Sequence, residues 1–158
     1  DVTAIDVFTP RASMHLSEQR PATLEHAQYS FPFVLATMLC CGEAGGPELG
    51  EAAVFDPARL AVAAKVGVHH DPVLDPTYPA HYATRLVVRT RSGEYEELRE
   101  VAPGDAEDPM SDDDLAAKFE RLAAGSPFAG LAGELVADDD TPVPPDLLRQ
   151  LVPGDHAD

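Results

Sequence analysis

Alternating hydrophobic and polar positions predict four strands along this chain. The first covers residues 2–9, which read VTAIDVFT and end at Pro10. Alternation of this kind is typical of a strand that buries one of its two faces. The same pattern predicts strands over residues 66–71, 82–90 and 94–101. We therefore expect a small, mostly antiparallel sheet.

The last two predicted strands flank Ser92-Gly93, which is a two-residue hairpin signal. A turn at these two residues sets each strand arginine opposite a carboxylate and one apolar residue opposite another: Arg91 with Glu94, Arg89 with Glu96, Arg85 with Glu100, and Val87 with Leu98. The arginines could instead form an anion-binding patch. The predicted register favours a solvated ladder of ion pairs over that alternative.

Residues 23–42, TLEHAQYSFPFVLATMLCCG, have the spacing of a helix with one apolar stripe. The stripe consists of Leu24, Ala27, Phe31, Val34 or Leu35, and Met38. Pro32 has no N–H to bond to the carbonyl of Gln28, so the helix should kink or restart near Ser30. Gln28, Tyr29 and Ser30 then form a polar elbow in an apolar rod. A kinked core helix without chemistry is the alternative interpretation.

Capping residues predict two more helices. Asp56-Pro57 provides a capping carboxylate and a proline at the first helical position, so a helix should cover residues 57–65. Ser111 precedes three aspartates, which favours a helix over residues 112–124. Together with the strands, these helices predict an α+β fold in which helices pack on the sheet.

The composition changes after this region. We expect a single α+β domain over residues 1–136, with a short helix near residues 128–136. Residues 137–158 are rich in aspartate and proline, and we interpret them as an acidic tail that carries a short helix over residues 147–152. The chain begins inside a predicted strand without Met, which is consistent with a domain cut from a longer protein.

Charge sets this chain apart from most proteins. Its 158 residues include 28 acidic and 11 basic ones, a formal net charge of −17, and only Lys65 and Lys118 are lysines. Such a charge repels nucleic acids and anionic membranes. We expect a cytoplasmic protein that binds neither. Acid-rich surfaces suit a salt-loaded cytoplasm, where counter-ions screen self-repulsion, so we predict a halophilic source.

Two clusters could have carried metal or redox chemistry. Cys40 and Cys41 are adjacent, so a bridge between them would be strained, and two ligands are too few for an iron–sulfur cluster. We interpret them as reduced packing residues. His69, His70 and Asp71 are ligand-type residues on a predicted strand, where neighbouring side chains face opposite ways. We therefore predict no metal site.

Four segments occur in a characteristic order: IDVFT, PATLEHAQYSFPFVLATMLCCG, FDPARLAVAAKVGVHHD and PMSDDDLAAKFERLA. In this order they resemble the C-terminal domain of the MmgE/PrpD family, which includes 2-methylcitrate dehydratase, cis-aconitate decarboxylase and iminodisuccinate epimerase. The resemblance covers Ile5 to Ala123 and implies an α+β domain.

The resemblance also implies an activity. Members of the family are lyases or isomerases of small di- and tricarboxylates, as in 2-methylcitrate dehydration during propionate catabolism, and they use no metal or other cofactor. Their active site lies between this domain and a larger helical domain of the same protein. The expected partners are therefore a small carboxylic acid and the missing helical domain, and an exposed domain interface also allows a homodimer. We expect the isolated chain to be inactive.

Through the resemblance, the elbow lies at the edge of the active-site cleft, with Gln28, Ser30 and Phe33 as substrate-binding residues. Many relatives carry tyrosine at the position of Phe33, and phenylalanine cannot transfer a proton. Tyr29 is not an obvious substitute, because relatives usually carry phenylalanine there. The catalytic residues therefore stay unknown. The rival hypothesis is a non-catalytic interaction or dimerisation module that retains the fold.

Overall fold

The computed structural model describes residues 1–46, 48–126 and 128–135. The chain separates into two compact units, Asp1–Pro109 and Met110–Asp158, and each is described by itself below. The predicted acidic tail over residues 137–158, including its helix, lies outside the described residues. The division into a domain over 1–136 and a tail therefore stays a prediction.

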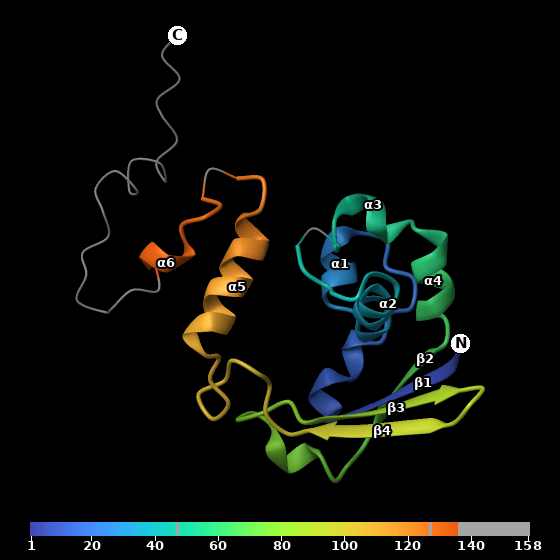
Figure 1. The fold of residues 1–158 in the computed structure, drawn as a ribbon. Helices are drawn as coiled ribbons and strands as arrows, with labels where there is room; N and C mark the ends of the chain where they lie inside the picture. The colour runs from blue at the N-terminus through green and yellow to red at the C-terminus, as the bar shows by residue number, and fades with distance from the viewer. Residues whose placement is uncertain (47, 127, 136–158) are drawn as a thin grey trace. The chain divides into compact units, whose positions relative to one another are not determined.

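A four-stranded mixed sheet forms the base of the first unit (Figure 1). Its strands are β1 (Val2–Thr9), β2 (Val66–His70), β3 (Thr84–Thr90) and β4 (Glu94–Arg99), in the spatial order β2-β1-β3-β4. β1 pairs in parallel with β2 and antiparallel with β3, and β3 pairs antiparallel with β4. The predicted strands and the mostly antiparallel α+β fold are confirmed.

Four helices of this unit lie over one face of the sheet (Figure 1). They are α1 (Leu24–Gln28), α2 (Phe31–Cys41), α3 (Glu51–Val54) and α4 (Pro57–Ala63), and short 3-10 turns cover Arg11–Leu16 and Asp75–Thr77. The Asp56 carboxylate accepts the backbone N–H of Ala58 at 2.9 Å, so the predicted cap of α4 is confirmed. No helix among the described residues is long and apolar enough to cross a membrane.

Two apolar clusters hold these helices in place. In the first, Ile5 and Val7 of β1 and Val66 of β2 pack against Phe31 and Leu35 of α2. This cluster explains the alternation of β1. Ile5 and Val7 face the helices, whereas Asp6, which lies between them, faces the other side of the sheet. The second cluster lies among the helices and contains Ala27, Phe33, Ala53 and Val54. Burial of these side chains fixes α1, α2 and α3 against one another.

The β3–β4 hairpin differs from the predicted register by two residues. Arg89 lies opposite Glu94 rather than Glu96, and Arg85 lies opposite Leu98 rather than Glu100. Val87 accordingly lies opposite Glu96 and not Leu98, and Arg91 does not pair with Glu94, because Arg91 lies beyond the end of β3.

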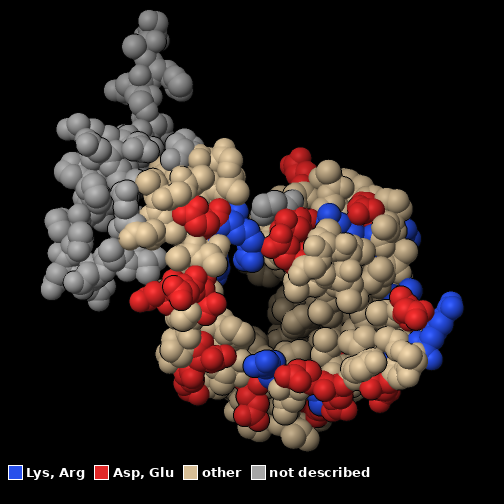
Figure 2. Space-filling view, viewed as in Figure 1, with Lys and Arg blue, Asp and Glu red and all other residues tan. Residues whose placement is uncertain are grey.

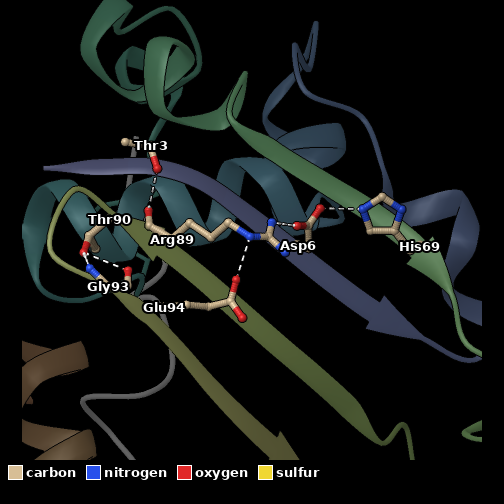
Figure 3. A network of polar contacts seen from close by, with 7 residues as sticks. All are labelled: Thr3, Asp6, His69, Arg89, Thr90, Gly93 and Glu94. Atoms are coloured by element: carbon tan, nitrogen blue, oxygen red, sulfur yellow. Dashed lines mark hydrogen bonds and ion pairs between the residues drawn. The ribbon is translucent and has the colours of Figure 1, made fainter.

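Thr90 explains the shift (Figure 3). Its hydroxyl accepts the backbone N–H groups of Ser92 and Gly93, at 3.2 and 3.1 Å, and donates to the carbonyl of Gly93 at 3.0 Å. The backbone N–H of Thr90 also bonds to this carbonyl, at 2.8 Å. The turn is thus closed around Arg91 and Ser92. A shift of two residues leaves every side chain on its predicted face, since the side-chain period of a strand is two.

The second unit is described from Met110 to residue 135, without residue 127. It contains α5 (Asp112–Ala123) and α6 (Ala132–Leu135). The Ser111 hydroxyl accepts the N–H of Asp114, whose carboxylate accepts the N–H of Ser111, so the predicted start of α5 is confirmed as a capping box. The predicted short helix near 128–136 appears as the single turn of α6.

Candidate functional site

The elbow is built from two separately capped helices. The Thr23 hydroxyl accepts the N–H of His26 at 3.3 Å and starts α1, which ends at Tyr29. The Ser30 hydroxyl accepts the N–H of Phe33 at 3.0 Å and starts α2. Pro32 lies in the first turn of α2, where its missing N–H would have had no helical partner. The predicted restart of the helix near Ser30 is confirmed.

Ser30 also attaches the elbow to the loop before α1. Its hydroxyl donates to the backbone carbonyl of Glu18 at 2.5 Å, and the side chain is buried. The same oxygen therefore caps α2 and holds a loop that lies 12 residues earlier in the chain. A hydroxyl has one donor and two acceptor sites, and Ser30 uses its donor and one acceptor within the chain.

The three predicted site residues differ in exposure, and only Gln28 and Ser30 belong to the elbow, because Phe33 lies within α2. The ring of Phe33 is fully buried beside Ala27 and Val54, and Ser30 lies below the surface next to it. The Gln28 side chain is exposed, as is the neighbouring Tyr29, at 68%. On the surface of this unit, Gln28 is therefore the one of the three that a dissolved ligand can reach.

The structure adds a titratable pair beside the elbow. His26 Nδ1 lies 3.3 Å from a carboxylate oxygen of Glu18, and both side chains are about half exposed. The bond from Ser30 to the Glu18 carbonyl holds the backbone of Glu18 at this place. Sequence analysis missed the pair, because nothing in the irregular loop that carries Glu18 indicates that it folds back on α1.

A second polar network lies on the face of the sheet that the helices leave open (Figure 3). One oxygen of Asp6 lies 2.6 Å from Nε2 of His69, and the other bonds to the guanidinium of Arg89. Arg89 also bonds to Glu94 at 2.8 Å. The hydrogen bond from Arg89, followed by the one from His69, lowers the pKa of Asp6 below its ordinary value.

Gly67 leaves room for this network. A Cβ at this position would lie 2.8 Å from Nε2 of His69 and 3.2 Å from the Asp6 oxygen that His69 contacts. Gly67 pairs directly with Asp6 across β1 and β2, so both residues face the same side of the sheet. The close contact between Asp6 and His69 therefore depends on the absence of a side chain between them.

Arg85 lies on the same face of β3, four residues before Arg89. It bonds to Asp71 at 3.0 Å and to Glu96 at 3.4 Å, and its guanidinium lies 3.9 Å from the centre of the Phe8 ring. The hydrogen bond with Asp71 is the main reason that the pKa of Arg85 is raised. Arg85, like Arg89, thus lies between two carboxylates. The ion-pair interpretation is confirmed with different partners, and an anion-binding patch is not supported.

The two adjacent histidines, which could have formed a metal site, contact different carboxylates. His69 contacts Asp6 from the open face, whereas His70 bonds to Asp75 at 2.9 Å. Among the described residues, no three His, Cys, Asp or Glu side chains converge as a metal site would require.

Cys40 and Cys41 are free and exposed, so the predicted packing role of these two residues is wrong. The physical reason is that the last turn of α2 is open to solvent from Met38 onward.

Comparison with protein families identifies one family that the chain matches. The model of the MmgE/PrpD C-terminal domain matches residues 1–130. The chain belongs to this family. The match includes the sheet, the elbow and α5, which confirms the expected resemblance. No curated protein matches this MmgE/PrpD domain significantly.

Proposed function

We propose that this MmgE/PrpD domain is part of a lyase or isomerase of a small di- or tricarboxylate, with 2-methylcitrate dehydration as the leading candidate reaction. The family match over residues 1–130 carries the proposal, because it contains the complete elbow. In this proposal the elbow forms one wall of the active site. A helical domain of the same protein forms the opposite wall and supplies the catalytic groups.

Gln28, Ser30 and Phe33 have different roles in this proposal, because they differ in exposure. The exposed amide of Gln28 has two donors and a carbonyl acceptor, and its donors suit a substrate carboxylate. Ser30 positions this amide by capping α2 and by holding the Glu18 carbonyl. Phe33 anchors the elbow in the core. In this scheme Gln28 touches the substrate, and the other two residues act through the elbow.

The proposed reactions remove a proton from a carbon atom next to a carboxylate, which requires a base and an acid. Phe33 can serve as neither. The chain therefore binds substrate on one side and depends on the helical domain for proton transfer, so the isolated chain should show no turnover.

The decisive experiment uses the full-length protein that contains this domain, in molar salt, with 2-methylcitrate as substrate. We expect the unsaturated product to accumulate. A Gln28→Ala variant should raise KM more than it lowers kcat, and Glu25→Ala, on the exposed side of the same helix, serves as the matched control. Absence of turnover on 2-methylcitrate and on related tricarboxylates would contradict the proposed activity.

A second candidate is a non-catalytic interaction or dimerisation module. The observation that favours it is Phe33, which lacks the hydroxyl that many relatives carry at this position. The gene sequence separates the two candidates. A preceding helical domain with active-site histidines supports the enzyme, and a start codon directly before Asp1 supports the module.

A further inference from the structure

A groove of about 480 Å³ lies in the first unit, between the loop that precedes α1 and the helix α4. Its volume falls within the range of small-molecule sites. Gln19 and Arg20 line one side, and Leu60, Ala61 and Ala64 line the other. None of the elbow residues assigned to the substrate lines this groove.

The wall formed by α4 is apolar. Leu60 is partly buried, whereas Ala61 and Ala64 are exposed, and all three line the groove. Phe55 stands beside them and is 72% exposed. It also lines an adjoining depression of about 260 Å³, together with Leu24 and Val54. A hydrocarbon chain along this wall would remove apolar surface from water, which is favourable.

The opposite side carries an unpaired cation. Within the described part of the chain, Arg20 makes no hydrogen bond or ion pair, whereas Arg59, Arg85 and Arg89 all contact carboxylates. The residue before Arg20 is attached to the sheet, because the side-chain amide of Gln19 donates to the backbone carbonyl of Val66 at 2.7 Å. Although the chain has a formal charge of −17, the Arg20 guanidinium is thus available to an anion from solution.

We propose that this groove binds an amphipathic carboxylate, with the carboxylate on Arg20 and the hydrocarbon chain along α4 and Phe55. A guanidinium binds a carboxylate through two parallel hydrogen bonds. A compact polycarboxylate fits poorly, because its further charges would lose water against the apolar wall without gaining a partner. The site is thus independent of the substrate site proposed at the elbow.

The test is a binding experiment on the complete chain, followed by NMR of backbone amides at one fixed salt concentration. The probes are octanoate, the neutral octan-1-ol of the same chain length, and acetate. We expect octanoate to shift the amide signals of Arg20, Phe55, Ala61 and Ala64. Octan-1-ol should bind about tenfold more weakly, since it lacks the charge-assisted hydrogen bonds, and acetate should cause no shift at the same concentration.

Two variants test the assignment from opposite sides of the groove. Arg20→Gln should weaken octanoate binding about tenfold and leave octan-1-ol binding unchanged. Ala61→Asp places a carboxylate on an exposed position of the apolar wall and should abolish octanoate binding. Arg91→Gln is the matched control, because the Arg91 side chain is 81% exposed and lies at the hairpin turn, outside the groove.

Three results would overturn the proposal: no octanoate binding, equal affinity for octan-1-ol, or octanoate binding that survives both Arg20→Gln and Ala61→Asp. The measurement requires no turnover. A failure here therefore leaves the proposed carboxylate chemistry at the elbow untouched, and inactivity of the full-length enzyme leaves this groove untouched.

Discussion

Ser30 shows how a single side chain can join two parts of the chain. Its hydroxyl caps α2 through Phe33 and holds the carbonyl of Glu18, so one oxygen satisfies a helix N–H and ties down a loop. The residue type and its place before Pro32 were sufficient to predict a helix start. The partner Glu18 was not predictable, because no local pattern connects an irregular loop with a particular cap.

Replacement of Ser30 by alanine should therefore cost more than an ordinary cap. We expect the free energy of unfolding to fall by about 2 to 3 kcal/mol, because the N–H of Phe33 loses its cap and the carbonyl of Glu18 loses a buried donor. Urea unfolding followed by circular dichroism measures the change. Ser17→Ala, at an exposed position of the same loop, is the control. Equal stability of the two variants would contradict the role of Ser30.

Asp6 provides a prediction about acid stability. Its pKa is lowered in the folded chain, first by the hydrogen bond from Arg89, and a lowered folded pKa adds stability above the ordinary pKa of 3.8. This contribution should disappear as the pH falls below about 4 toward the folded pKa. Asp6→Asn should therefore be less stable than the parent chain at pH 7 and should lose less stability on acidification.

Urea unfolding at pH 7 and pH 3 tests this prediction for Asp6. Asp105→Asn, at an exposed position outside the sheet, is the matched control and should behave as the parent chain does. If Asp6→Asn shows the same pH dependence as the parent, the network on the open face does not stabilise the fold through Asp6.

At the scale of elements, the hairpin shows where local signals become insufficient. Ser92-Gly93 is a sound turn signal, yet the Thr90 hydroxyl binds three backbone groups and closes the turn one residue earlier. The ion-pair ladder still forms, because the shift preserves the faces of β3 and β4. The two short helices at the elbow were easier to predict, since Pro32 and Ser30 act within a single turn.

The role of Thr90 is testable with valine, which has nearly the same shape but no hydroxyl. We expect Thr90→Val to reduce the free energy of unfolding by about 1 to 2 kcal/mol, because the N–H groups of Ser92 and Gly93 lose their acceptor in an exposed turn. Thr84→Val, at the other end of β3, removes a single exposed hydrogen bond and should have a smaller effect. The opposite order would refute this explanation of the register.

At the scale of the whole molecule, charge is the dominant feature. Figure 2 shows acidic side chains spread over the face in view, including the side on which Figure 1 places β3 and β4. The formal charge of −17 already counts Arg85 and Arg89, so the ion pairs that these two residues form leave the excess of acidic groups unchanged. Self-repulsion should therefore oppose folding when few counter-ions are present. The halophilic source stays a prediction that rests on this balance.

Removal of salt tests the charge argument directly. The Debye length grows from about 3 Å at 1 M salt to about 30 Å at 0.01 M, so repulsion between acidic groups extends across the unit in dilute buffer. We expect the chain to lose far-UV circular dichroism on dialysis from molar salt to about 0.01 M. Recovery of the signal on return to molar salt separates this effect from aggregation. Unchanged secondary structure in dilute buffer would refute the halophilic interpretation.

The sequence by itself determined the features that act over a few residues. Alternation predicted the four strands, capping residues predicted the starts of α4 and α5, and Pro32 with Ser30 predicted the restart at the elbow. The ordered motifs predicted the MmgE/PrpD family, which the match over residues 1–130 confirmed. Backbone propensity, capping and periodicity act locally, so the printed sequence contains them in full.

Only the tertiary structure decided which distant groups meet. The strand order places Asp6 between His69 and Arg89, which lie 63 and 83 residues further along the chain. The same long-range packing buried Phe33, left Gln28 exposed and placed Arg20 across a groove from α4. These contacts depend on how the strands pair and how the helices pack, and no local pattern specifies either. The elbow could thus be predicted as a structure, whereas the exposure of its residues could not.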